Sequence, residues 1–190
     1  DLLIKRNKSL LKFYNSKVDY VVFHEGNIYV DHQNYISSFT PKLKLIFIDI
    51  GESFVKEDIP IKIEMKWGLG YRNMCNFWFT KFWKYVQKYE RIIRIDEDCI
   101  FYSNYNHIFN LLEDKVSVFA KKSYDQLFVI KGLNDFTINF LNNKNIKAKK
   151  RNVWGPYTNV IGLNLIKLRK NLILKEYINS IKNSKNIFYY

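Results

Sequence analysis

The sequence has few chain-breaking residues and few cysteines. Its 190 residues include 7 glycines, 3 prolines and 2 cysteines. Cys75 and Cys99 lack the spacing of metal ligands, so we expect both to be ordinary buried thiols. No apolar run approaches the roughly 18 residues of a membrane-spanning helix. The sequence therefore excludes a cysteine-based metal module and contains no transmembrane segment.

The sequence is rich instead in apolar, aromatic and basic residues. Hydrophobic residues make up 47% and aromatic residues 17% of the chain, which is typical of a folded globular protein. The length suits one domain over residues 1–190 and is too short for two of ordinary size. The net charge of +13 favours phosphorylated substrates, polyanions or anionic membrane surfaces. Lys, Asn and Ile are all abundant, as AT-rich coding sequence produces, so part of this charge reflects composition alone.

Apolar segments with strand and helix patterns alternate along the chain. We expect strands at Leu2–Ile4 and at 20–23, 43–48, 91–95, 99–101, 116–120 and 160–163, and helices at 9–13, 72–86, 108–112, 136–141 and 165–181. In the longest single helical pattern the apolar residues that recur at helical spacing are Met74, Phe77, Trp78, Phe82, Tyr85 and Val86. The alternation predicts an α/β domain with a mainly parallel sheet, in which ligands bind outside the carboxyl ends of strands. Arg6, Glu25 and Asp96 are expected at such ends.

Three consecutive acidic residues follow the β-branched strand at 91–95. Asp96, Glu97 and Asp98 each need water, a counter-charge or a metal. In extended chain Asp96 and Asp98 point to one side, where they offer two hard oxygen ligands to a divalent cation that also binds phosphate oxygens. The alternative interpretation is a solvated acidic turn. Arg94 either supports a bound diphosphate or only neutralises the acids.

The segment at Gly70–Phe77 (GYRNMCNF), followed by Tyr89 and by RIDED at residues 94–98, resembles the signature of the fungal α-1,2-mannosyltransferase family (Kre2/Mnt1-like). In that family a Tyr-Arg-x-Met helix precedes a strand that ends in Glu-Pro-Asp. Weaker matches follow the same order along nearly the whole chain, at Arg6-Asn7, at residues 19–23, at 157–159 and at 188–190.

The resemblance implies a single Rossmann-like GT-A domain that binds a GDP- or UDP-sugar donor with Mn²⁺ or Mg²⁺. It implies transfer of a sugar, with mannose one candidate, to a glycan or glycoprotein acceptor. The donor-binding residues that it implies are Arg6, Asn7, Tyr71, Arg72, Arg94, Asp96 and Asp98, of which Asp96 and Asp98 hold the metal. Tyr157 and Asn159 would bind the acceptor or form the wall of the active site. For Tyr71 and Arg72, which follow Gly68 and Gly70, a helix-capping loop is the alternative.

The chain also departs from the family pattern. Asp96-Glu97-Asp98 replaces Glu-Pro-Asp, and Val160-Ile161-Gly162 stands where the family has its catalytic glutamate. The catalytic residue is therefore unassigned. The chain begins without Met and ends where the family continues, so we expect a domain truncated at its C-terminus. We expect a soluble domain, either cytoplasmic or, within a longer membrane-anchored chain, in the Golgi lumen.

Two other functions compete with an active glycosyltransferase. A sugar-nucleotide-binding module without turnover is compatible with the missing glutamate. A nucleic-acid-binding protein is suggested by a basic cluster beside Trp154, formed by Lys144, Lys147, Lys149, Lys150 and Arg151. Charge runs are usually solvated surface, so the nucleic-acid interpretation is the weaker one.

Overall fold

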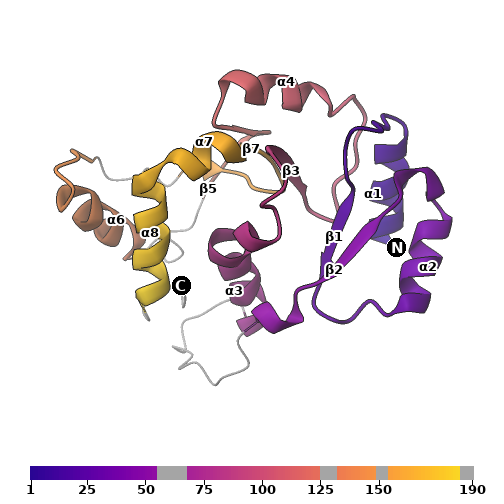
Figure 1. Cartoon of the computed structure of the whole chain (residues 1–190), viewed down its shortest axis with the longest axis horizontal. Helices are drawn as coiled ribbons and strands as arrows, with labels where there is room; N and C mark the ends of the chain where they lie inside the picture. The colour runs from indigo at the N-terminus through magenta and orange to yellow at the C-terminus, as the bar shows by residue number, and fades with distance from the viewer. Residues whose placement is uncertain (55–67, 125–131, 149–153, 185–190) are drawn as a thin grey trace. The chain divides into compact units, whose positions relative to one another are not determined.

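The computed structural model describes residues 1–54, 68–124, 132–148 and 154–184 (Figure 1). The chain groups into two compact units. Unit 1 contains residues 1–55, 91–118 and 159–164, and unit 2 contains residues 56–90, 119–158 and 165–190. The assignment of residues 1–190 to one domain stays a prediction. Among the described residues, every helix is too short or too polar to cross a membrane.

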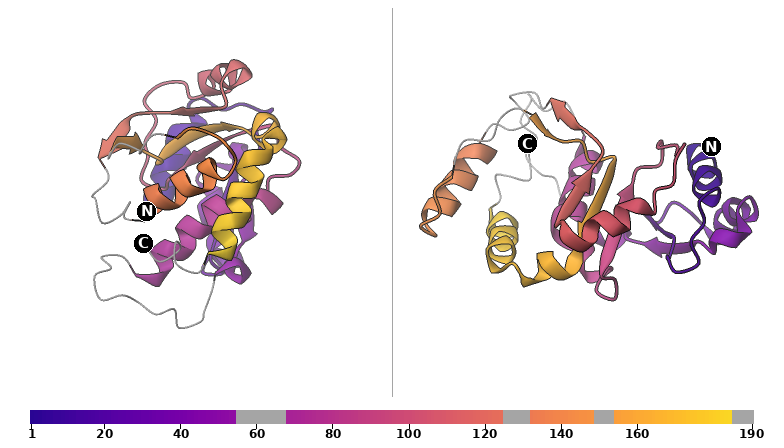
Figure 2. Two further views of the ribbon diagram at one scale, coloured as in Figure 1. Left: turned by 90° about the vertical axis from the view of Figure 1, so that its left-hand side faces the viewer. Right: turned by 90° about the horizontal axis from the view of Figure 1, so that it is seen from above.

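Unit 1 begins with two helices that cover a parallel strand pair. Its first elements are α1 (Leu2–Leu11), β1 (Val21–His24), α2 (Val30–Ser38), η1 (Pro41–Leu43), β2 (Ile46–Asp49) and η2 (Gly51–Ser53). Strands β1 and β2 pair from Val21↔Ile46 to His24↔Asp49. Leu3 and Ile4 of α1 pack with Val22 and Ile36, and Figures 1 and 2 show both helices beside the strands.

The strand expected at Leu2–Ile4 is wrong, because these residues form the first turn of α1. The Asp1 carboxylate accepts hydrogen bonds from the backbone N–H of Leu3 (2.9 Å) and of Ile4 (3.4 Å). This N-cap satisfies amides that a helix start leaves unpaired. A short apolar segment fits a strand or a helix equally well, and here the cap residue decides for the helix.

The rest of unit 1 is built on an antiparallel strand pair. Its elements are β3 (Arg91–Ile95), α4 (His107–Asp114), β4 (Ser117–Phe119) and β7 (Val160–Asn164), and the strand order is β3-β7-β4. Strands β3 and β7 pair antiparallel from Arg91↔Asn164 to Ile95↔Val160. The expected α/β character is confirmed. The expected mainly parallel sheet is confirmed only for β1–β2.

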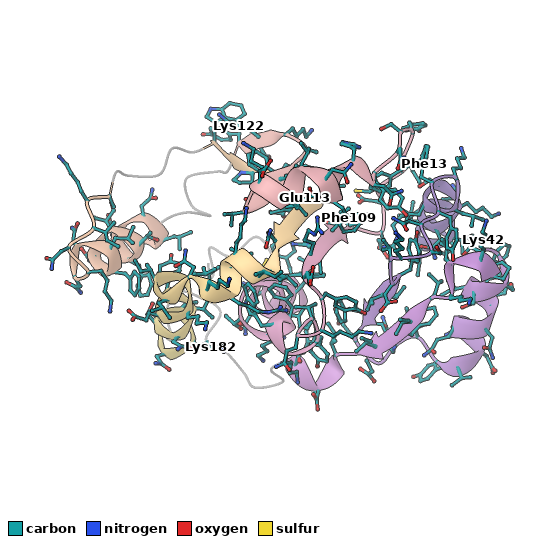
Figure 3. All side chains as sticks on the ribbon, turned by 45° about the horizontal axis from the view of Figure 1, so that its top comes forward. Phe13, Lys42, Phe109, Glu113, Lys122 and Lys182 are labelled. Atoms are coloured by element: carbon teal, nitrogen blue, oxygen red, sulfur yellow. The ribbon has the colours of Figure 1, made fainter. Side chains whose placement is uncertain are left out.

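Helix α4 lies tightly against this strand pair. A Cβ atom added to Gly162 of β7 would stand 2.7 Å from Ile108 Cγ2 and 3.1 Å from Leu112 Cδ1. Leu112 is fully buried. Along the same stretch of the helix, Arg91 Nη1 of β3 donates to the Phe109 carbonyl (2.9 Å) and to Glu113 Oε1 (3.2 Å), and Figure 3 labels Phe109 and Glu113. Helix α4 is therefore fixed across β3 and β7.

Unit 2 contains most of the remaining helices. Its elements are α3 (Leu69–Asn76), the π-helical turn η3 (Phe77–Lys81), η4 (Phe82–Lys84), β5 (Lys122–Tyr124), α6 (Leu133–Asn142), β6 (Trp154–Pro156), α7 (Leu165–Lys170) and α8 (Leu172–Asn183). The helix expected at 72–86 is confirmed as a helical path that widens at η3 and tightens at η4. Phe77, Phe82 and Val86 are buried, as the apolar pattern predicts. Its packing against the sheet stays a prediction. The Phe79 ring meets the Tyr177 ring of α8 edge to face.

Two smaller expectations are wrong. Cys75 is exposed rather than buried, because it lies one helical turn after the exposed Tyr71, on the same face of α3. Residues 99–101 form no strand. The Cys99 N–H donates to the Asp96 carbonyl (3.2 Å) and the Phe101 N–H donates to Ser9 Oγ (3.0 Å), so this backbone pairs within a turn and with α1.

Candidate functional site

The acidic residues lie at the carboxyl end of β3. The strand ends at Ile95, and the Asp96 N–H donates to the Asn159 carbonyl just before β7 (2.8 Å). The structure therefore brings Asp96 and Asn159 together, although 63 residues of sequence separate them. Asp96 is half-buried, whereas Glu97 and Asp98 are exposed. Glu97 and Asp98 form a turn, so strand alternation does not decide where these carboxylates point. That part of the expectation, which assumed extended chain, is wrong.

Arg94 and Asp96 form an ion pair across one strand period. Arg94 Nη2 lies 3.0 Å from Asp96 Oδ1, and their side chains are 12% and 33% exposed. The two residues are next-but-one neighbours, so β3 presents them on one side. The neutralising role expected for Arg94 is confirmed. Its role toward a bound diphosphate stays a prediction.

Arg6 approaches the same loop from α1. Its Nη1 donates to the Ile95 carbonyl (3.4 Å), and its Nε and Nη2 donate to Asn7 Oδ1 (3.3 and 3.1 Å). Burial lowers the pKa of the Arg6 guanidinium, and the negative charges of Glu97 and Asp96 act in the opposite direction. The position expected for Arg6, at the end of a strand, is wrong. The helix instead carries this cation to the end of β3.

The buried side-chain amide of Asn7 has a hydrogen-bond partner for its oxygen but, among the described residues, none for its nitrogen. The side chain is 1% exposed, and its Oδ1 accepts from Arg6. Among the described residues no partner is found for Nδ2. An unpaired buried donor costs about 1–3 kcal/mol. The amide is therefore suited to an acceptor oxygen that the described residues do not supply.

Ser9 and Cys99 are the residues that sequence reasoning missed. Ser9 Oγ donates to the Arg6 carbonyl (2.7 Å) and accepts from the Phe101 N–H, so it ties the acidic loop to α1. Cys99 Sγ lies 3.8 Å from Asp98 Oδ1 and 3.7 Å from the Asn159 carbonyl. Burial raises the pKa of the Cys99 thiol, and the charges of Asp98 and Asp96 raise it further. The only signal for Ser9 was its place one helical turn after Arg6.

The remaining predicted site residues belong to unit 2. Tyr71 stands near the start of α3 with 49% of its surface exposed. Arg72 is buried, and burial lowers its pKa. Tyr157 follows β6, and its N–H donates to the Lys121 carbonyl (2.9 Å). The roles of these three residues toward a donor or an acceptor stay predictions. No side-chain cap bond is found at Gly68, the N-cap of α3.

The basic cluster is only partly within the described residues. Lys144 forms an ion pair with Glu176 of α8, and Lys147 is exposed. Lys149, Lys150 and Arg151 lie outside the described residues, as do Tyr189 and the two residues beside it in the C-terminal match. The ion pair of Lys144 reduces the positive charge that the described part of the cluster offers to a polyanion.

Metal binding by the acidic loop stays a prediction, and the loop offers two aspartates for it. Across residues 1–54, 68–124, 132–148 and 154–184 there is no group of three His, Cys, Asp or Glu side chains placed to hold a metal ion. Mg²⁺-type sites often use one or two carboxylates, with water and substrate phosphates in the other positions. Asp96 and Asp98 fit that kind of site, in which the cation binds together with a diphosphate.

The chain is similar to solved structures of other proteins, whereas comparison of its sequence with family models and curated proteins finds no match. The mannosyltransferase Ktr4p from S. cerevisiae matches with a TM-score of 0.76 and 21% identity over 98% of this chain and 58% of that one. Its complex with GDP matches at a TM-score of 0.75 and 20% identity, over the same 98% and 58%.

A second mannosyltransferase-like structure agrees with the first. Core-mannan synthase A (CmsA/Ktr4) from Aspergillus fumigatus, in its Mn/GDP form, matches with a TM-score of 0.80 and 18% identity, over 99% of this chain and 62% of that one. The chain thus spans about three fifths of the length of these proteins. The resemblance noted in the sequence is confirmed at the level of the fold: this chain is folded like the fungal mannosyltransferase Ktr4p and Core-mannan synthase A.

Proposed function

We propose that the chain is a glycosyltransferase domain that transfers a sugar from a nucleoside-diphosphate donor to a glycan or glycoprotein acceptor. A GDP-sugar is the first candidate donor and mannose the first candidate sugar. The fold supports this proposal, because similar structures are of mannosyltransferases and include GDP and Mn/GDP forms. The observation that carries it is the cluster at the end of β3. Arg6 donates to the Ile95 carbonyl, next to Asp96, and to Asn7 Oδ1, and no partner for Asn7 Nδ2 is found among the described residues.

The chemistry needs stabilisation of the leaving diphosphate. Negative charge grows on its oxygens as the bond to the sugar breaks. A divalent cation held by Asp96 and Asp98 would act there as a Lewis acid. Arg6 adds a fixed positive charge beside these acids, and the Asn7 Nδ2 amide can donate to a phosphate or ribose oxygen. The hydrogen bond from the Asp96 N–H to the Asn159 carbonyl keeps the acidic loop in place before the donor arrives.

Nucleotide titrations test the proposed donor site. GDP and UDP are titrated by calorimetry into the whole chain with Mn²⁺ and with EDTA. We expect GDP to bind more tightly with Mn²⁺. Asp98→Asn should remove most of that gain, because it halves the carboxylate ligands. The control is Asp31→Asn, which removes an exposed carboxylate in the first turn of α2. Equal Mn²⁺ dependence in Asp98→Asn and the parent protein would place the metal elsewhere.

A sugar-nucleotide-binding module without turnover is the second candidate. The residue paired with Arg94 on β7 is Ile161, so this position near the acidic loop carries no carboxylate. A transfer assay with GDP-mannose and a mannoside acceptor separates the two candidates. GDP binding with measurable transfer supports the enzyme. GDP binding without transfer, at enzyme concentrations that match the titration, selects the module.

A further inference from the structure

The outward face of the β5–β6 pair is unusually aromatic. The strands pair antiparallel as Lys122↔Pro156, Ser123↔Gly155 and Tyr124↔Trp154. Exposure alternates along both strands, so that Ser123 and Gly155 are covered while the other four residues face outward. Lys122, on this face, is labelled in Figure 3. Trp154 and Tyr124 are 53% and 54% exposed. A solvated strand face normally carries polar side chains, and exposed aromatic groups of this kind mark binding surfaces.

The two aromatic rings form a corner rather than a flat surface. The ring centroids of Tyr124 and Trp154 lie 5.7 Å apart, and the ring planes meet at 76°. One ring therefore offers its electron-rich face as a floor, and the other stands beside it as a wall. Lys122 and Pro156 occupy the neighbouring cross-strand pair on the same face. Lys122 therefore lies on the same strand face as the two rings, one cross-strand pair away.

A pyranose ring has the shape and chemistry for such a corner. One of its faces carries C–H groups with slight positive charge, which are attracted to the negative face of an aromatic ring. Its rim carries hydroxyl groups, which accept hydrogen bonds from an ammonium such as that of Lys122. Successive bases of a single strand need stacking faces that follow one another. Two rings at 76° do not provide them.

We propose that the Tyr124–Trp154 corner binds a sugar residue of the acceptor glycan. This inference rests on the proposed glycosyltransferase function and assigns a binding site for its acceptor, in which one sugar residue stacks on an aromatic ring. Tyr124 and Trp154 belong to β5 and β6, whereas the acidic loop follows β3. We expect loss of one ring to lower the affinity for the acceptor and to leave the affinity for the nucleotide unchanged.

Direct binding of α-1,2-mannobiose, measured by saturation-transfer NMR on the whole chain, tests the proposal. We expect Trp154→Ala and Tyr124→Ala each to lower the affinity for mannobiose about fivefold or more, because each removes one aromatic contact. Trp154→Phe keeps a ring and should retain most of the affinity. Tyr102→Ala, which removes an aromatic side chain that is 89% exposed in unit 1, is the matched control and should change nothing.

Two further probes separate failure of the corner from failure of the proposed function. GDP affinity with Mn²⁺ should be equal in all four variants and the parent chain. If the parent binds GDP but Trp154→Ala binds mannobiose unchanged, the corner is overturned while the donor site stands. If the parent binds no GDP, the proposed function fails, whatever the corner binds. A third outcome is that the chain binds oligothymidine (dT10) through Trp154 and does not bind mannobiose. That result would overturn the proposed sugar site and favour a nucleic-acid site.

Discussion

At the scale of single residues, the side chains near the end of β3 leave a buried hydrogen-bond donor, Asn7 Nδ2, without a partner among the described residues. Arg6 is held by the Ile95 carbonyl and by Asn7 Oδ1, and Asp96 is held by Arg94. Asn7 Oδ1 accepts a hydrogen bond from Arg6, whereas no acceptor for Asn7 Nδ2 is found among the described residues. A buried polar group without a partner is rare in folded proteins and usually has a functional reason. The proposed nucleotide donor would supply an acceptor oxygen at this position.

Replacing Asn7 by Asp separates ligand binding from folding. Asn7→Asp keeps an oxygen for Arg6 and strengthens that pair by adding a charge. It replaces the free donor by an oxygen that repels phosphate. We expect the urea midpoint to stay the same or rise, and GDP affinity to fall at least about tenfold, which equals about 1.4 kcal/mol. The measurement is a urea titration beside a GDP titration. Unchanged GDP affinity would show that the unpaired amide has no ligand role.

At the scale of elements, the close fit of α4 on β7 fixes the strand that pairs with β3 beside the candidate site. Gly162 leaves no room for a side chain under Ile108 and Leu112. Asn164 Nδ2 donates to the Leu112 carbonyl (2.7 Å), and the Asn164 N–H donates to the Val116 carbonyl (2.9 Å), so the C-terminal end of β7 is held by α4 and by the segment after it. Since Asn159 precedes β7 and receives the Asp96 N–H, this packing also positions the acidic loop.

A methyl group at Gly162 should therefore force α4 away from the sheet. Gly162→Ala places Cβ 2.7 Å from Ile108 Cγ2, well inside van der Waals contact. We expect a loss of about 1–3 kcal/mol in the free energy of unfolding, the usual cost of overpacking. The control is Gly70→Ala in α3, where nothing lies within 4 Å of the added atom. Alanine is a better helix former than glycine by about 0.8–1 kcal/mol, so the control variant should not lose stability. Equal urea midpoints for the two variants would contradict the packing described here.

At the scale of the whole molecule, the net charge of +13 acts on every anion in solution. Such a charge speeds encounter with a nucleoside diphosphate and also attracts nucleic acid without specificity. The two kinds of binding differ in their response to salt. Contacts with many backbone phosphates release many counterions, whereas a donor held by a cation and a few hydrogen bonds depends less on ionic strength.

A salt titration distinguishes these contributions. Between about 50 and 200 mM NaCl we expect dT10 affinity to fall by a factor of at least about 30, as for proteins that contact several phosphates. GDP affinity with Mn²⁺ should fall by less than about threefold over the same range. Fluorescence anisotropy measures the first and calorimetry the second. Oligonucleotide binding that survives 200 mM salt would favour a nucleic-acid function.

The sequence by itself determined the elements with long or repeated patterns. The apolar spacing of residues 72–86 predicted a helical segment, and the β-branched run before Asp96 predicted β3. The acidic tripeptide and its neighbours predicted both a candidate site and the resemblance that the fold confirms. These features are local, since they depend on residues a few positions apart. Short segments were less certain, and the strand expected at Leu2–Ile4 became a helix because Asp1 caps it.

Only the tertiary structure decided which distant residues meet. The antiparallel pairing of β3 with β7 brings Asn159 to Asp96, and the packing of α1 brings Arg6, Asn7 and Ser9 to the same loop. The Tyr124–Trp154 corner exists because β5 and β6 pair in one register. Such contacts depend on strand order and direction, which no pattern within a single segment specifies. That is the physical reason why composition and spacing predicted the chemistry of the candidate site but not its geometry.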